Sequence, residues 1–462
     1  MPAIKPELLS GFRDMLPAEA LARQKMISEI EEVYESFGFM PLKTPCMEKR
    51  DVLTGGSSDF NKSIFMARIV KGAEDKDVLE KEFEDDFALR FDLTVSLARV
   101  VAAYPELPRP FKRYQIGKVW RGERSQAGRF REFSQLDFDI IGSQTILADI
   151  EVLQIMYEVM KKLAIANFTI RFNSRKVLNG LAKIVGCGDK SKEMFRIIDK
   201  LDKIGLADVL SELQREPDNE WDESALAMSK QDSEKIARFL KIKEGNSENI
   251  LKQLRSFFEE NNDHNQEGLK ELEEISLALK NLDIPEKNCR IDLSVARGLD
   301  YYTGPVFETT LDDLPNLGSV FSGGRFDGLT NRFMAGSNVA GVGASVGVDR
   351  LFVGLEKLGL IEQKDSLTEV LVTVFNEKTR QESLRIANEI RKEGHLVEVY
   401  LGEDWSLRAQ FAYAAKRGIP FAIVVGPDEI ENQTMQLKDM TSRQQETLTL
   451  VECLIKIRGG IR

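Results

Sequence analysis

The spacing of apolar and polar side chains changes along the chain and divides it into segments with different expected structures. Within residues 16–39, apolar residues recur at helical spacing from Leu21 to Tyr34 and Gly38 follows them as a stop, so this stretch predicts an amphipathic helix. Residues 87–95 alternate instead, which predicts a half-buried strand. Its polar face carries Arg90, Asp92 and Thr94.

Two further strand-like runs, 113–121 and 132–141, are joined by the Gly- and Arg-rich loop GERSQAGRFR and predict a long antiparallel hairpin. The second run alternates, so Leu136, Phe138 and Ile140 share one face. The opposite face presents a ring, an amide and two carboxylates to one space: Phe133, Gln135, Asp137 and Asp139. Taken alone, such a hairpin is either a solvated, salt-bridged surface or a binding site.

Changes between strand-like and helix-like residue patterns suggest where the domains lie. Residues 1–174 and 286–362 are rich in strand patterns and form one interrupted domain, whereas residues 175–285 consist of charged helical segments and predict a helical insertion. Residues 367–462 alternate strand and helix patterns in a β-α-β-α-β order. That order predicts a small α/β domain with a largely parallel sheet.

Composition narrows the choice of partners. The chain has 462 residues and a net charge of −11, so a nucleic acid would have to be met by local basic patches. Its four cysteines are widely spaced and it has two histidines, which predicts no zinc site. No membrane-spanning run or leader pattern is evident, and we expect a cytoplasmic protein.

Three other segments add to the polar face of the hairpin and favour a binding site over a solvated surface. They are Asp92 with Thr94, Arg297 with Tyr301 and Tyr302, and Arg350 after a glycine-rich turn. Arginine suits phosphate recognition because its planar donors match phosphate oxygens, and carboxylates suit an ammonium group. The chain has no GxxxxGK[ST] phosphate loop. The residues therefore indicate a site for a zwitterion and a nucleotide that relies on arginines and magnesium.

The same segments carry a family resemblance. Residues 109–142 resemble motif 2 of the class II aminoacyl-tRNA synthetases in their histidyl form, and RGLDYY and SGGRFDGL resemble the two histidine signatures. FGFMPLKTP is similar to motif 1, GASVGVDRL to motif 3, and the segment around GIPFAIVVG to the anticodon-binding domain. These six segments occur in the order of the family and span about residues 10–460.

The resemblance implies a fold and a reaction. The fold is α+β: a class II catalytic domain on an antiparallel sheet of six or seven strands, a helical insertion and a C-terminal α/β anticodon-binding domain. The implied reaction joins L-histidine and ATP into histidyl-adenylate and then passes the histidyl group to the 3′ end of its tRNA. The expected partners are ATP with Mg²⁺, L-histidine, the histidine-specific tRNA and a second copy of the chain, with Pro45 at the dimer interface.

Roles for individual residues also follow from the resemblance. Arg121 and Arg297 would contact the α-phosphate as catalytic residues. The histidine-binding set is Asp92, Thr94, Gln135, Asp139, Tyr301 and Tyr302, of which Asp139 and Tyr302 hold the imidazole. The ATP-binding set is Arg121, Glu123, Phe133, Arg297 and Arg350, and Gln126 would meet the tRNA acceptor end.

Several alternatives stay open at this point. Tyr301 either packs in the core or binds histidine. Gly323 and Gly324 either shape a turn or form part of the site. The sequence does not decide whether Arg124, Arg129 and Arg131 contact ATP, contact tRNA or form salt bridges. The chain departs from the common pattern at Asp92, Asp139, Asp349, Phe326 and Ala415. The rival functions are a catalytically silent relative that regulates histidine synthesis or senses tRNA, and a class II synthetase for another amino acid such as threonine or proline.

Overall fold

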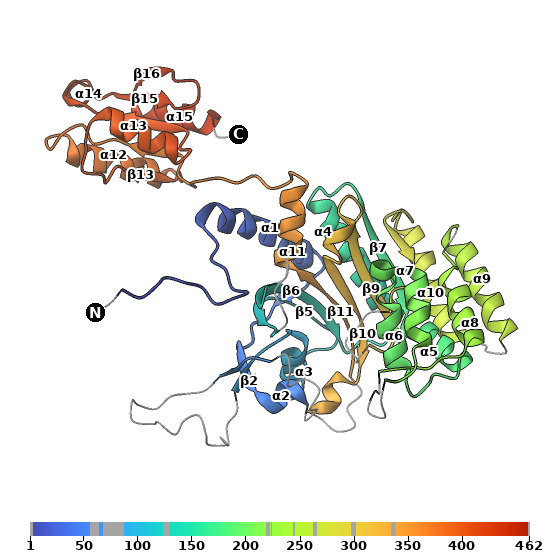
Figure 1. Cartoon of the computed structure of the whole chain (residues 1–462). Coiled ribbons are helices and arrows are strands. Elements are labelled where there is room, and N and C mark those ends of the chain that lie inside the picture. The colour runs from blue at the N-terminus through green and yellow to red at the C-terminus, as the bar shows by residue number, and fades with distance from the viewer. Residues whose placement is uncertain are drawn as a thin grey trace, which may run out of the picture. The chain divides into compact units, whose positions relative to one another are not determined.

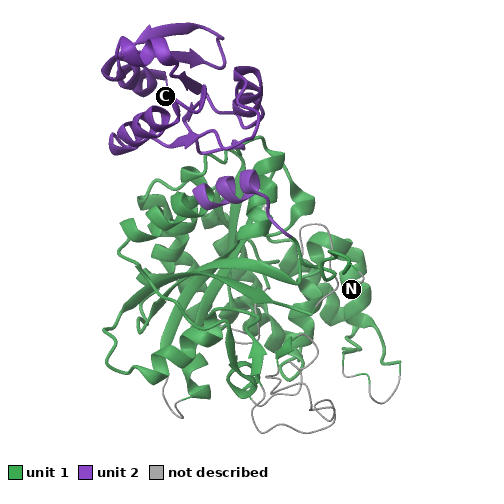
Figure 2. Cartoon of the chain, turned by 90° about the vertical axis from the view of Figure 1, so that its left-hand side faces the viewer, with its two compact units in different colours: residues 1–13, 26–361 green, residues 14–25, 362–462 purple. Residues whose placement is uncertain are grey.

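The computed structural model describes residues 3–55, 64–67, 87–122, 130–218, 222, 224–243, 245–261, 266–296, 302–333 and 339–460. The chain divides into two compact units, which are coloured separately in Figure 2. The first comprises residues 1–13 and 26–361, and the second comprises residues 14–25 and 362–462. The limits of the helical insertion and of the two catalytic segments stay predictions.

An eight-stranded sheet forms the centre of the first unit (Figure 1). Its inner pairs are antiparallel, whereas β1 and β8 at the two edges pair in parallel with their neighbours. The α+β class is confirmed, and the expected count of six or seven strands is too low because the short edge strands carry almost no sequence signal. In spatial order the strands are β1 (Met40–Pro41), β5 (Phe111–Trp120), β6 (Glu132–Ile141), β11 (Ala340–Gly347), β10 (Phe321–Asp327), β9 (Pro305–Leu311), β7 (Phe168–Ser174) and β8 (Cys289–Ile291).

The predicted hairpin is confirmed as β5 and β6, paired in register from Phe111 opposite Ile141 to Trp120 opposite Glu132. Its apolar face is fully buried, and the Phe138 ring lies 4.6 Å from that of Tyr34 on the predicted first helix, α1 (Pro17–Ser36). Two more helices pack on the sheet, α4 (Ile146–Lys162) against β10 and β11, and α11 (Val348–Lys357) against β6. Burial of this face leaves the alternate positions of β6 for a polar site.

The strand predicted over residues 87–95 is wrong in its second half. Only β4 (Phe87–Leu89) is extended, in a small sheet between β2 (Met47–Lys49) and β3 (Met66–Ala67), and helix α3 (Thr94–Ala103) follows. The Asp92 carboxylate accepts the N–H of Val95 at 3.1 Å and so satisfies one of the open donors of the first helical turn. A short helix, α2 (Arg50–Thr54), lies between β2 and β3 in the chain.

The predicted helical module is present between β7 and β8. Figure 1 shows its helices on one side of the sheet, and α10 contacts α4, α5 and α9. The helices are α5 (Arg175–Ile184), α6 (Ser191–Ile198), α7 (Leu201–Gln214), α8 (Lys230–Leu240), α9 (Ser247–Glu260) and α10 (Gln266–Asn281). Two 3₁₀ turns, Pro315–Leu317 and Leu329–Arg332, flank β10.

The second unit has a five-stranded mixed sheet rather than a largely parallel one. Three strands are parallel, β13 (Val397–Val399), β12 (Val370–Val372) and β14 (Phe421–Val424), as the alternating pattern predicts. Two antiparallel strands follow, β15 (Met435–Asp439) and β16 (Gln445–Leu448). The helices of this unit are α12 (Arg380–Lys392), α13 (Leu407–Lys416), α14 (Pro427–Glu431) and α15 (Leu450–Gly460). In the described part of the chain, no helix is long and apolar enough to cross a membrane.

A buried ion pair ties β10 to α4. The Arg325 Nε atom lies 3.1 Å from both carboxylate oxygens of Asp149, and its two Nη atoms donate to the carbonyls of Ser143 and Thr145 at 2.9 and 3.1 Å. Both side chains are buried. Because the guanidinium satisfies a carboxylate and two carbonyls at once, its loss would leave a buried negative charge without compensation.

We therefore expect Arg325→Met to destabilise the first unit by about 3–5 kcal/mol. Urea denaturation, followed by hydrogen–deuterium exchange on β10 and α4, measures the change. Arg238→Met is the matched control, because Arg238 pairs with Glu260 at 2.7 Å on an exposed face. That control is expected to cost less than about 1 kcal/mol. Equal losses in the two variants would contradict a structural role for the buried pair.

Candidate functional site

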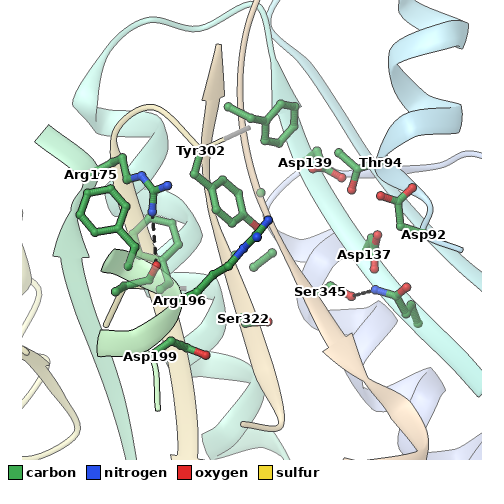
Figure 3. Close-up of a pocket in the computed structure, with 18 of the residues that line it drawn as sticks. Asp92, Thr94, Asp137, Asp139, Arg175, Arg196, Asp199, Tyr302, Ser322 and Ser345 are labelled. Carbon is green, nitrogen blue, oxygen red and sulfur yellow. Dashed lines mark hydrogen bonds between the residues drawn. The ribbon is translucent and has the colours of Figure 1, made fainter. Parts of the chain in front are cut away.

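A cavity of about 460 Å³ opens on the polar face of β6 in the first unit. Figure 3 shows the carboxyl groups of Asp92, Asp137 and Asp139 gathered on one side of it, with Tyr302 across from them. The cavity brings together six of the residues that the sequence singled out: Asp92, Thr94, Arg121, Gln135, Asp139 and Tyr302. Gly323, for which the sequence allows either a role in a turn or a role in the site, also lines the cavity.

The floor of the cavity depends on the pairing of three strands. Asp139 on β6 lies opposite Arg113 on β5 and opposite Gly343 on β11. A Cβ atom at position 343 would lie 2.2 Å from the Asp139 Oδ1 atom and 2.4 Å from the Phe138 carbonyl oxygen. Glycine is therefore required beside this carboxylate, which gives the Gly-rich segment of motif 3 a steric role in the site.

An ion pair lies beneath the cavity. The Arg113 Nη2 and Asp139 Oδ2 atoms are 2.6 Å apart, and both side chains are buried. Burial raises the pKa of Asp139 to about 6, while the charge of Arg113 opposes this rise. Arg113 was not among the residues expected at the site, because its place opposite Asp139 depends on a strand register that the sequence does not reveal.

Burial also raises the pKa of the two neighbouring carboxyl groups, Asp137 and Asp92. Burial raises the pKa of Asp137 to about 7; Arg113 lowers it, and the charges of Asp139 and Asp92 raise it further. The pKa of Asp92 is also raised by burial, against the bond from Val95 and the charge of Arg121. Three carboxyl groups thus surround a cavity in which their charged forms are poorly solvated, an arrangement that favours binding of a cation.

Gln135 and Ser345 connect β6 to β11 at the same level. The Gln135 Nε2 atom donates to the Ser345 hydroxyl at 2.6 Å, the dashed contact on the right of Figure 3. With its amide nitrogen engaged there, the Gln135 Oε1 atom is buried and has no hydrogen-bond donor among the described residues. The Gln135 amide oxygen can therefore accept a hydrogen bond from an N–H or O–H group of a ligand.

Arg121 lies at the end of the hairpin and lines the cavity as well. Its Nε atom donates to the Phe91 carbonyl at 3.1 Å, and its guanidinium carbon lies 5.1 Å from the centre of the Phe133 ring. Phe133 therefore packs near the cation but is not among the residues that line the cavity. A guanidinium fixed at the rim places a permanent positive charge beside the carboxylates of the floor.

The other expected site residues are not brought together by this cavity. Arg350 lies outside its lining, and its Nη1 atom donates to the Ser319 carbonyl at 2.6 Å. Asp349, next to it, accepts from the Ser134 N–H at 2.7 Å and from Arg13 at 3.2 Å, so it anchors α11 to β6. Arg297, Tyr301, Glu123 and Gln126, together with Arg124 and Arg129, lie outside the described residues.

The helical insertion supplies a wall that the sequence did not predict. The Arg175 guanidinium stacks 4.2 Å from the centre of the Phe195 ring and donates to the Ala296 carbonyl at 3.3 Å. Charged side chains in a helical module are more often solvated, and no local signal marks these as cavity residues. The insertion contributes Arg175, Lys192, Phe195, Arg196, Asp199 and Lys203.

Comparison with known proteins gives a consistent assignment. A family model described as histidyl-tRNA synthetase matches residues 11–351, and one described as anticodon binding domain matches residues 369–459. The chain is similar to the histidine–tRNA ligases of Wolinella succinogenes, 40% identical over 99% of both chains, and of Clostridium tetani, 42% identical over 99% of both. The crystal structure of histidyl-tRNA synthetase from a Nostoc species superposes with a TM-score of 0.84 at 32% identity and covers 99% of this chain and 100% of its own.

The raised pKa of Asp137 predicts a pH-dependent change in stability. A carboxyl group that binds its proton more tightly when folded stabilises the fold below its unfolded pKa of about 4, and this contribution is lost as the pH rises through its folded pKa. We expect Asp137→Asn to raise the free energy of unfolding at pH 8 by about 1–3 kcal/mol and to leave it unchanged near pH 4.

Urea denaturation at both pH values, followed by hydrogen exchange on β5 and β6, measures this difference. The matched control is Asp208→Asn, an exposed carboxylate on α7. Its effect should stay within about 0.5 kcal/mol at either pH. A stability gain for Asp137→Asn that does not depend on pH would show that the gain does not come from the buried charge.

Proposed function

Because the chain belongs to the histidyl-tRNA synthetase family, we propose that it is an ATP-dependent histidine–tRNA ligase whose cavity on β6 holds the amino acid. It activates L-histidine with ATP to histidyl-adenylate and pyrophosphate and transfers the histidyl group to the 3′ end of its tRNA. The observation that carries this proposal is the match over nearly the whole chain to histidine–tRNA ligases, with both units represented.

Activation of histidine requires no covalent intermediate with the protein. The carboxylate of histidine attacks the α-phosphorus of ATP, and pyrophosphate leaves with the electrons of the broken phosphoanhydride bond. The protein contributes by holding the two reactants in line and by stabilising the charge that develops on the phosphate oxygens. In the second step the terminal ribose hydroxyl of tRNA attacks the acyl carbon and AMP leaves.

Arg121 is the described residue best placed for the phosphate role. Its guanidinium is fixed at the cavity rim by the Phe91 carbonyl and lies beside Phe133. A cation held there needs no reorganisation when charge develops on the α-phosphate. Arg297, assigned the same role by the resemblance, stays a prediction, as do the assignments of Glu123, Phe133 and Arg350 to ATP and of Gln126 to the tRNA acceptor end.

Histidine fits the polar floor of the cavity with its two ends separated. The α-ammonium would lie against Asp92, Thr94 and Gln135, since the Asp92 Oδ2 and Gln135 Oε1 atoms are buried acceptors without a donor among the described residues. The imidazole would lie between Asp139 and Tyr302, a carboxylate and a phenol that line the cavity. Tyr301 remains a predicted member of this set.

Magnesium enters the proposal with ATP, as part of that substrate. Among the described residues there is no group of three or more His, Cys, Asp or Glu side chains arranged to hold a metal ion. The phosphate oxygens would therefore supply most of its ligands, in keeping with the preference of Mg²⁺ for phosphates and water. The expectation of no zinc, the homodimer and the cytoplasm as the place of action also stay predictions.

The rival functions fit the chain less well. A silent regulatory relative typically lacks the anticodon-binding domain and loses the arginines of the motifs, whereas this chain has a matching domain over residues 369–459 and retains Arg121, Arg297 and Arg350. A synthetase for threonine or proline is disfavoured by RGLDYY and by the helical insertion between β7 and β8. The tRNA contacts of the second unit are not assigned to residues.

ATP–pyrophosphate exchange tests the proposed activity directly. The purified chain is supplied with magnesium, ATP and each of the twenty amino acids in turn. We expect exchange with L-histidine alone, followed by acylation of histidine-specific tRNA. Absence of exchange with every amino acid would overturn the proposal in favour of the silent relative, and exchange with another amino acid would replace histidine as the substrate.

Tyr302→Phe tests the imidazole subsite. The variant keeps the ring that packs beside Phe326 but removes the hydroxyl, so a buried ring nitrogen of the ligand would lose its partner. We expect calorimetry to show histidine affinity reduced about tenfold and ATP affinity unchanged. Tyr104→Phe, at an exposed tyrosine after α3, is the control. Unchanged histidine affinity in Tyr302→Phe would remove this residue from the subsite.

A further inference from the structure

Asp137 is a buried carboxylate in the cavity that the proposed function does not use. It lies on β6 between Gln135 and Asp139, its side chain is 2% exposed, and its Oδ1 atom has no hydrogen-bond donor among the described residues. Neither the sequence motifs nor the assigned roles give it a task. A buried acceptor without a partner is costly, so its presence in a cavity calls for a ligand that satisfies it.

Its surroundings provide little compensation. Arg113 is the cation whose charge acts most strongly on it, but the guanidinium of Arg113 is already paired with Asp139 at 2.6 Å. The Ser345 hydroxyl, which accepts from Gln135, hydrogen-bonds the Asp137 carboxyl, while the charges of Asp139 and Asp92 oppose its ionisation. Among the described residues, the floor of the cavity has an ion pair at Asp139, and Asp137 has none of its own. The other described cations that line the cavity, Arg121 and those of the insertion, form no ion pair with Asp137.

The open acceptors match the donors of one chemical group. Four buried oxygens around the cavity have no hydrogen-bond donor among the described residues, and one of them, Asp139 Oδ2, is ion-paired with Arg113. The other three have no such compensation: Asp92 Oδ2, Gln135 Oε1 and Asp137 Oδ1. A primary ammonium group has three N–H donors and one positive charge. In Figure 3 the Asp137 carboxyl lies between Asp92 and Ser345, the residue that holds the Gln135 amide, so these three side chains adjoin one part of the cavity.

We propose that Asp137 binds the α-ammonium group of L-histidine, together with Asp92 and Gln135, and so makes the site selective for ligands that carry an amino group. This inference rests on the proposed function, since it takes histidine as the occupant of the cavity. Asp139 and Tyr302 keep the imidazole role that the proposed function assigns to them. The positive charge of the ligand compensates the carboxylate that Arg113 leaves unpaired.

Three ligands separate this role from the alternatives. L-Histidine has the ring, the ammonium and the carboxylate; L-histidinol keeps the ring and the ammonium; imidazole-4-propionate keeps the ring and the carboxylate but has no amino group. A residue that contacts the ammonium affects the first two and spares the third. A residue that contacts the ring, or that only maintains the cavity, affects all three.

The experiment measures the dissociation constants of the three ligands by calorimetry, in displacement format for weak binders, with wild type, Asp137→Asn and Asp137→Ala. We expect Asp137→Asn to weaken L-histidine and L-histidinol by about tenfold or more while imidazole-4-propionate changes less than about twofold. Asp137→Ala should show the same selectivity with a larger loss, because it also removes the acceptor oxygen. ATP affinity should stay unchanged in both variants.

Asp139→Asn provides the contrast, because a group that holds the ring should weaken all three ligands together. Equal losses for the three ligands in Asp137→Asn, or no loss for any, would overturn the role of Asp137 while leaving the proposed function intact. Failure of the wild-type chain to bind L-histidine would overturn both. Folding is verified independently, since Asp137→Asn is expected to stabilise the apo protein at pH 8.

Discussion

The buried ion pair between Arg113 and Asp139 is the interaction on which the arrangement of the site depends. It joins the two strands of the central hairpin beneath the cavity and offsets one of three carboxylates that would otherwise repel each other in a desolvated space. Isolated from water, such a pair contributes little net stability. The pair instead fixes the position of Asp139, the carboxylate proposed to bind the imidazole, because it is held against a guanidinium that stays charged.

The other two carboxylates, Asp92 and Asp137, determine the electrostatic character of the site. Neither carboxylate forms an ion pair with a described residue, and burial raises the pKa of each. Stability is thereby given up in the unliganded protein, and a cationic ligand group restores the balance. Arg121 places the opposite charge in the lining of the same cavity, so the cavity presents both a cation and buried carboxylates to a zwitterionic ligand.

The sequence predicts those parts of the site that depend on local residue spacing, and not those that depend on contacts between distant segments. The polar face of β6 was predictable because a two-residue period with a fully apolar opposite face leaves little choice of structure. The same reasoning failed for residues 87–95, where the strand ends at Leu89 and the Asp92 carboxylate instead accepts a hydrogen bond from the first turn of α3. Arg113 required the strand register, and Lys192 and Arg196 required a contact between the insertion and the sheet. Neither is encoded in local spacing.

The cavity draws its lining from segments that are far apart in the chain: the start of α3, strands β6 and β11, the residues before β9, and the insertion helix α6. No single one of these segments supplies the whole lining of the cavity proposed to bind histidine. On the proposed function, histidine would bind only the completed fold of that unit, and a high concentration of histidine would shift the folding equilibrium of newly made chains toward the native state by mass action. The concentration of histidine and the amount of folded protein would then be linked through the buried oxygens that bind the amino acid.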